Sequence, residues 1–214
     1  MSDIFREVDE EIRHERYAEL WKRYGLWIIG VALALVLAVA GYQGWEAYQR
    51  SQARDASQRY ADALAKIETQ SPAAAIQALE SVAGSAPEGY ALLARLRTAA
   101  LQAETGEIRA AVATWDAIAD NAETPAPFRT LATLFSVMNR MVNGDAAALS
   151  RELKPIAEGD GAFRATAVEL QAVLAMKQNQ TARAIELYKR IADGAQVPAQ
   201  QRQRATQMLA QLEG

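Results

Sequence analysis

The strongest constraint on this chain is a long uncharged stretch near its amino terminus. No charged residue occurs from Tyr24 to Trp45, and segment 26–42 contains only aliphatic, aromatic and glycine residues. At ~1.5 Å rise per residue this window forms about 33 Å of helix, enough to cross a hydrocarbon core of ~30 Å. A backbone in lipid must satisfy its own hydrogen bonds, so a spanning segment here has to be helical. The sequence therefore predicts one transmembrane helix over residues 24–45.

Residues typical of a membrane interface flank this stretch on both sides. Aromatic rings favour the headgroup level, and long basic side chains reach it by snorkelling. The expected interface anchors are Lys22, Arg23, Tyr24, Trp27, Tyr42 and Trp45. The alternative is a helix buried in a soluble core, but such helices seldom run this far without a polar residue.

The same stretch has a second alternative, a signal peptide cleaved after Ala38-Val39-Ala40. However, its apolar part is longer than the ~7–15 residues of a typical signal peptide, and the residues before it are rich in Asp and Glu. An uncleaved signal-anchor fits better. Five basic residues precede the span and three follow it over a comparable length. Because positive charge stays in the cytoplasm, we expect the amino terminus inside and the large carboxyl-terminal part outside.

Small residues recur on one face of the predicted span. They are Gly30, Ala34, Ala38 and Gly41. Such a stripe lets another helix approach closely, and close packing drives helix association in lipid. Because glycine and alanine are common in spanning helices, an ordinary lipid-facing role is the alternative.

The span divides the chain into three expected parts, 1–23, 24–45 and 46–214. Residues 1–23 are predicted to form a short charged cytoplasmic helix, in which apolar residues from Ile4 to Ile12 recur at three- and four-residue steps. This helix is either a solvated tail near the headgroups or a docking helix with its own partner. Residues 46–214 are long enough to form one ordinary domain with a real core.

The composition argues against several classes of function. After residue 45 the chain has 18 Lys and Arg against 19 Asp and Glu, with no basic block that would indicate nucleic-acid binding. There is no cysteine, and the single histidine, His14, precedes the span. No glycine-rich phosphate loop, HExxH or serine elbow occurs. We therefore predict no catalytic, cofactor-binding or metal-binding residues and no small-molecule substrate. An enzyme with an unrecognised site is the alternative.

Internal repeats organise residues 46–214. Segment 118–125 (IADNAETP) matches segment 191–198 (IADGAQVP) at an offset of 73, and Phe128-Arg129 matches Phe163-Arg164 at an offset of 35. These offsets correspond to helical hairpins of the ~34-residue tetratricopeptide type. In each hairpin a small residue allows the two helices to cross closely, and a large apolar residue fills the gap to the next hairpin. The small residues are Ala99, Ala111, Ala172 and Ala184, and the large ones are Leu79, Trp115, Leu153 and Tyr188.

The predicted fold is all-α: one amino-terminal transmembrane helix followed by a tetratricopeptide-like α-solenoid. The first repeat helix is expected to continue from the span. The four hairpins are expected at 49–69 with 72–84, 88–105 with 108–121, 127–142 with 146–158, and 162–178 with 182–193. A last helix at 199–212 is polar on its outer side, as suits a terminal cap.

This order of parts resembles the bacterial ancillary SecYEG translocon subunits. The local likeness lies in segment 51–60 (SQARDASQRY) and in Tyr90, Leu93, Ala94, Leu96 and Ala99. The resemblance implies a periplasmic domain at the inner membrane, beside the translocon, that associates with periplasmic chaperones and handles exported proteins without catalysis. The chain lacks the early tryptophan and the glycine-tyrosine pair of standard tetratricopeptide repeats. The domain of periplasmic cell-division coordinators looks similar too, so a coordinator of cell-envelope assembly or cell division is the alternative.

The expected functional surface is the groove lined by the first helix of each hairpin. By helical spacing, the residues predicted to point into it are Leu96, Leu134, Met138, Met141 and Met176. Flexible methionines would suit varied protein clients. The alternative is that these side chains belong to the core between hairpins, because apolar residues at helical spacing are usually core.

Overall fold

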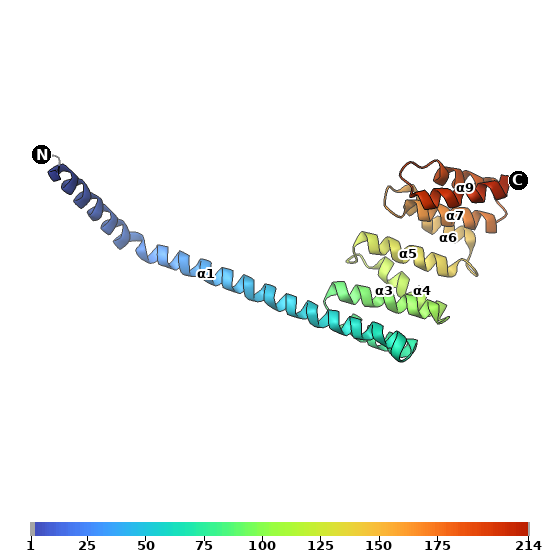
Figure 1. Ribbon diagram of the computed structural model, residues 1–214, viewed down its shortest axis with the longest axis horizontal. Coiled ribbons are helices and arrows are strands. Elements are labelled where there is room, and N and C mark those ends of the chain that lie inside the picture. Colours follow the sequence, from blue (N-terminus) through green and yellow to red (C-terminus); the bar gives the residue numbers. More distant parts are fainter. Residues whose placement is uncertain (1–2, 214) are drawn as a thin grey trace. The chain divides into compact units, whose positions relative to one another are not determined.

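The computed structural model describes the backbone of residues 3–213 and the side chains of residues 21–27 and 29–213. Within this part of the chain every regular element is a helix (Figure 1). The helices are α1 Asp3–Thr69, α2 Pro72–Ser85, α3 Glu88–Glu104, α4 Ile108–Asp120, α5 Ala126–Arg140, α6 Ala146–Glu158, α7 Arg164–Lys177, α8 Thr181–Ala192 and α9 Ala199–Glu213. The expected side-chain roles of residues 1–20, His14 included, lie outside the described side chains.

The chain divides into two compact units, Met1–Arg54 and Asp55–Gly214. Helix α1 is continuous through the boundary, which confirms that the first repeat helix continues from the apolar segment. Between Trp21 and Thr69, α1 is long and apolar enough to cross a membrane. The large apolar side chains that the structure describes from Leu26 to Val39 are 47–87% exposed. These described side chains form the apolar surface that a lipid-facing segment requires.

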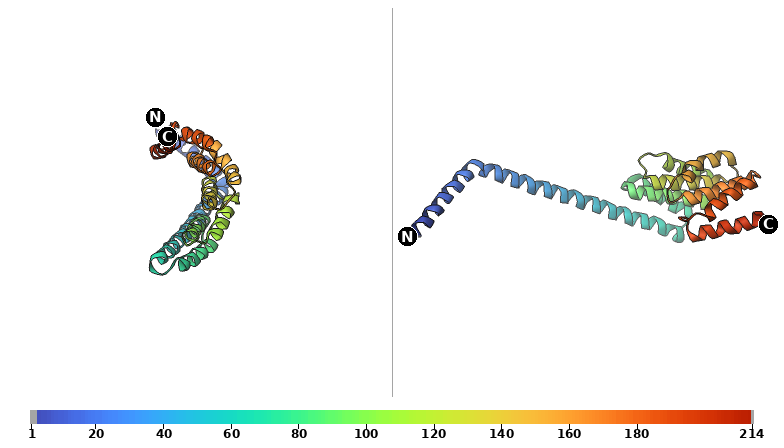
Figure 2. Two further views of the ribbon diagram at one scale, coloured as in Figure 1. Left: turned by 90° about the vertical axis from the view of Figure 1, so that its right-hand side faces the viewer. Right: turned by 90° about the horizontal axis from the view of Figure 1, so that it is seen from above.

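In the second unit the helices pack in series, each against its neighbours in sequence. Figure 2 shows that α2 to α9 follow a curved path. The apolar core is accordingly divided into clusters: one joins the end of α1 to α2 and α3, one joins α3 to α5, and one runs from α5 to α9. This division is expected of a solenoid, in which each repeat buries its apolar face only against adjacent repeats.

Burial confirms the repeat pattern predicted from the sequence. The four small residues at the expected crossings, Ala99, Ala111, Ala172 and Ala184, have no exposed surface. The large residues of the predicted ridge, Leu79, Trp115, Leu153 and Tyr188, are at most 3% exposed. Small side chains let two helix backbones approach, and the large side chain one turn further on fills the space that the crossing leaves.

Local hydrogen bonds decide where several helices begin and end. Ser71 caps α2 by accepting a hydrogen bond from the Ala74 amide at 3.2 Å, and Asp145 caps α6 through the Ala147 amide at 3.0 Å. Helix α5 ends at Arg140, two residues before the expected end. There the Met141 amide donates to the Met138 carbonyl at 3.3 Å, three residues back, and the Gly144 amide donates to the Arg140 carbonyl at 2.7 Å. A Cβ at Gly144 would lie 2.7 Å from that carbonyl oxygen, so this turn requires glycine.

Helix α9 closes the series. It buries Ala205 against the preceding hairpin, whereas Arg204 forms two hydrogen bonds of 3.0 Å to Glu169 on α7. Gln201 also donates to Thr166 at 3.1 Å. The predicted cap is therefore present: one side of α9 completes the core and the other is polar.

Candidate functional site

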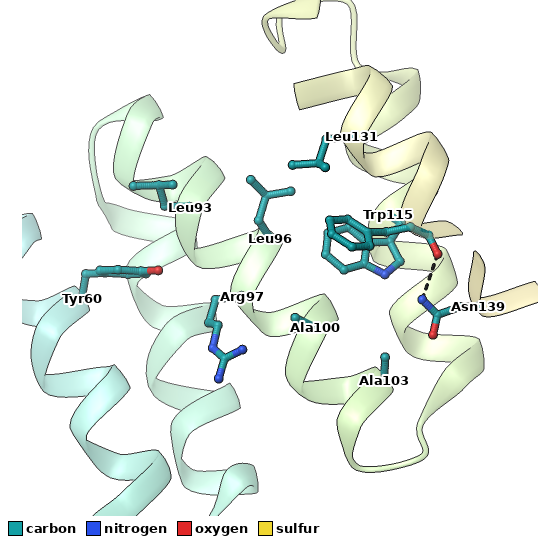
Figure 3. A pocket seen from close by; sticks show the side chains of 10 residues that line it. Tyr60, Leu93, Leu96, Arg97, Ala100, Ala103, Trp115, Leu131 and Asn139 are labelled. Carbon is teal, nitrogen blue, oxygen red and sulfur yellow. Dashed lines mark hydrogen bonds between the residues drawn. The ribbon is translucent and has the colours of Figure 1, made fainter. Parts of the chain in front are cut away.

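An apolar cavity of about 400 Å³ lies along the first helices of three successive hairpins. Its walls are Leu93 and Leu96 of α3, Leu131 and Phe135 of α5, and Trp115 of α4 (Figure 3). Tyr60, from the end of α1, lines it as well. We call this cavity the Trp115 groove.

The helical period explains why these side chains share one face. Leu93, Leu96 and Ala100 on α3 are three and four residues apart, and Leu131 and Phe135 on α5 are four apart. The Trp115 ring stacks on Phe135 with centroids 5.0 Å apart and 29° between the planes. Trp115 is 3% exposed, so the indole forms a fixed wall of the groove.

The groove carries no unbalanced charge. Arg97 is its one charged lining residue, and its Nη1 donates to Glu104 Oε1 at 3.1 Å. Asn139, the polar residue at the α5 end, donates from Nδ2 to the Phe135 carbonyl at 2.8 Å. In contrast, the Trp115 Nε1–H is buried and has no acceptor among the described residues. The surface is thus apolar and electrically neutral, with one unused hydrogen-bond donor in its wall.

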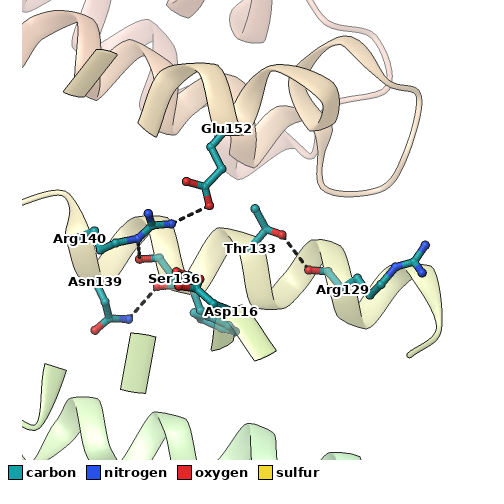
Figure 4. Close-up of polar contacts among 8 residues, drawn as sticks. Asp116, Arg129, Thr133, Ser136, Asn139, Arg140 and Glu152 are labelled. Carbon is teal, nitrogen blue, oxygen red and sulfur yellow. Dashed lines mark hydrogen bonds and ion pairs between the residues drawn. The ribbon is translucent and has the colours of Figure 1, made fainter. Parts of the chain in front are cut away.

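A polar cluster beside the groove holds α5 between its neighbours (Figure 4). Ser136 has no exposed surface and donates to the Asp116 carboxylate of α4. Arg140 donates to Glu152 of α6 at 2.6 Å. Lys177 Nζ reaches the carbonyls of Met141 and Val142 at 2.6 Å each, which ties α7 to the end of α5. These contacts fix the helix that contributes Leu131, Phe135 and Asn139 to the groove wall.

The five residues predicted to point into the groove lie in different surroundings in the structure. Leu96 lines the Trp115 groove, and Met138 is 46% exposed on α5. Leu134 is 3% exposed within the core that runs from α5 to α9, and Met141 and Met176 pack against the same core. The expectation is therefore corrected for Leu134, which is not accessible to a partner. The physical reason is angular: Leu134 and Phe135 are about 100° apart on one helix, and α6 and α7 cover only the first.

Sequence reasoning missed Leu93, Leu131 and Phe135 as groove residues. A signal for one of them was present, because the repeat offset of 35 that relates Phe128 to Phe163 also carries Leu96 onto Leu131. Applying this offset to a single groove residue would have identified the correct face of α5.

The residues predicted for membrane contact are exposed where the structure describes them. Tyr24, Trp27, Tyr42 and Trp45 are 48–75% exposed, and Lys22 and Arg23 are exposed as well. A Cβ added at Gly30 or Gly41 would meet no atom within 4 Å, and Ala34 and Ala38 are exposed. The small-residue face is thus open, and its role in helix packing stays a prediction.

The described part of the chain contains no recognised arrangement of catalytic or metal-binding side chains. No group of three or more His, Cys, Asp or Glu side chains there could hold a metal ion. The pKa of Tyr188 is raised, first by burial and then by the nearby Glu169 carboxylate, but this residue lies in the core between α7 and α8. We assign it a packing role.

A curved series of helical hairpins with an apolar groove along its first helices defines a class of helical-repeat proteins that act through protein–protein interaction. The family of tetratricopeptide repeat-like domains matches residues 19–213, and the chain belongs to this family. A search of curated proteins found no match.

Proposed function

We propose that this protein is a membrane-anchored, non-enzymatic scaffold for protein–protein interaction in bacterial protein export. In this proposal residues 24–45 cross the inner membrane once, residues 1–23 are cytoplasmic, and residues 46–214 form the periplasmic interaction domain. The partners are SecYEG translocon subunits, periplasmic chaperones or exported clients.

The observation that carries the scaffold proposal is the Trp115 groove. Three first helices contribute apolar side chains to one cavity, and Leu93 remains 40% exposed at its wall. An exposed apolar surface of this kind on a repeat domain is typical of a partner site. The export assignment is supported by the resemblance of the chain to ancillary translocon subunits and by a helix long enough to anchor it.

Site-specific photo-crosslinking in living cells tests both the partner site and the assignment to protein export. A photoreactive amino acid replaces Leu93 or Leu131, which both line the groove. Ile108 on α4 serves as a control, because its exposed fraction is 38% against 40% for Leu93. We expect translocon subunits or periplasmic chaperones to be captured from the groove positions and not from Ile108. Capture of cell-wall synthesis proteins would favour the alternative, a coordinator of envelope assembly or division. Equal capture from all three positions would refute the assignment of the groove as the partner site.

Topology has a separate test, because the chain contains no natural cysteine. The exposed residue Asp120 is replaced by cysteine for the predicted periplasmic domain, and Arg6 for the predicted cytoplasmic segment. We expect a membrane-impermeant maleimide to label Asp120→Cys in intact cells with a permeable outer membrane, and Arg6→Cys only after lysis. The reverse pattern would invert the proposed orientation.

A further inference from the structure

We propose that the Trp115 groove recognises an uncharged stretch of polypeptide that presents large apolar side chains, and that it discriminates against charged peptide tails. This inference rests on the proposed function and defines the chemistry of the partner segment. Three properties of the groove lead to it: its charge balance, its wall composition and the unused donor of Trp115.

Charge balance is the first property. The one cation in the lining, Arg97, is paired with Glu104 of the same helix at 3.1 Å. Glu104 therefore balances the charge of Arg97, and its carboxylate would repel an acidic ligand. A basic ligand would meet Arg97 itself. Charge complementarity therefore favours a neutral occupant.

The wall composition is the second property. Leu93, Leu96 and Leu131 supply aliphatic side chains, and the stacked rings of Trp115 and Phe135 supply aromatic ones. A cavity of about 400 Å³ has room for large aliphatic or aromatic side chains. Because Leu93 is 40% exposed and lies in none of the three core clusters, an occupant would remove apolar surface from water that folding leaves exposed.

The third property distinguishes a polypeptide from an acyl chain. Trp115 Nε1–H is buried without an acceptor, and an unsatisfied buried donor is unfavourable. Figure 3 shows Asn139 beside the indole ring, with its amide directed to the Phe135 carbonyl. When Asn139 moves aside, a backbone carbonyl of a bound peptide can accept from the indole, whereas an acyl chain has no acceptor along its length.

The chain provides its own reporter for this binding. It has four tryptophans, and Trp115 is the only one after residue 45. In the full-length protein reconstituted in nanodiscs, Trp21→Phe, Trp27→Phe and Trp45→Phe leave Trp115 as the single source of indole emission. The probes are a capped Gly/Ser/Asn peptide with one Leu and one Phe, the same peptide with both replaced by Glu, the same with both replaced by Ser, and a monoacylglycerol.

We expect the Leu/Phe peptide to change the Trp115 emission in a saturable way and to bind at least tenfold more tightly than the other three probes. Tighter binding of the Glu peptide would overturn the charge argument, and tighter binding of the monoacylglycerol would identify a lipid site. The absence of any saturable change would overturn the inference as a whole.

A matched pair of variants assigns the signal to the groove. Leu93→Ser should weaken binding of the Leu/Phe peptide about tenfold, a difference of about 1.4 kcal/mol. Ile108→Ser removes an apolar side chain of similar exposure outside the groove and should leave the affinity unchanged. Equal weakening by both would refute the assignment. If Leu93 crosslinks to export partners but no probe binds, the inference fails and the proposed function stands. If the peptide binds but no export partner is captured, the proposed export function fails and the groove chemistry stands.

Discussion

The apolar segment of α1 and the repeat domain use the same residue types with opposite burial. Leu35 in the segment is 63% exposed, whereas Leu153 in α6 has no exposed surface. Both are leucines on helices rich in alanine and leucine. The comparison shows that an apolar composition predicts that a side chain leaves water, but not what covers it. Neighbouring helices cover Leu153, and the candidates for Leu35 are lipid or another protein.

Small residues show the same contrast. Ala99 and Ala111 lie at a helix crossing and are fully buried, whereas a side chain at Gly30 or Gly41 would meet nothing within 4 Å. In the repeats the small residues lie where two helices of the same domain cross. In α1 the equivalent surface is open to the approach of another helix.

The largest expected effect is a difference in stability between one leucine substitution in the repeat domain and one in the apolar segment of α1. Leu153→Ala should lower the free energy of unfolding of the repeat domain by about 2–5 kcal/mol, because it leaves a cavity among α5 to α9. Leu35→Ala should leave that free energy unchanged. Urea denaturation of the detergent-solubilised protein, followed by circular dichroism, measures both. Comparable losses would mean that Leu35 is also packed against protein.

A charge in the apolar segment tests whether lipid is its partner. Leu35→Arg places a guanidinium near the middle of the predicted span, at a cost of about 2.5–3.5 kcal/mol for insertion. We expect a larger carbonate-extractable fraction of the protein, while Tyr48→Arg, at an exposed position beyond the span, should have no effect. Unchanged membrane retention of Leu35→Arg would contradict a single-pass anchor.

The smallest expected effect concerns the acid–base behaviour of a buried repeat residue. Burial, and secondly the Glu169 carboxylate, raise the pKa of Tyr188 above its ordinary value of 10.0. In alkali the unfolded chain then loses this proton before the folded chain does, so the contribution of Tyr188 to stability is complete below about pH 10 and falls as the pH rises through the folded pKa. Tyr188→Phe should reduce the loss of unfolding free energy between pH 9 and pH 11. An identical pH dependence in both proteins would show that other groups cause it.

Local patterns were sufficient to predict most helices. Helix α6 was predicted at its observed bounds, because Asp145 caps one end and the glycines after Glu158 terminate the other. Offsets of 35 and 73 located the hairpins, since repeats require the same crossing residues at the same positions. The helix ends at Arg140 and Arg164 were each misplaced by two residues, because they depend on turn hydrogen bonds around Gly144 and Gly161.

The sequence by itself determined the helical class, the apolar segment and the residues at the hairpin crossings, because periodicity and composition are properties of a single helix. Only the tertiary structure decided that Leu131 and Phe135 line the groove while Leu134 is buried, and that Glu104 neutralises Arg97 beside it. The physical reason is that a helix period gives the angle between two side chains but not which neighbouring helix covers each of them.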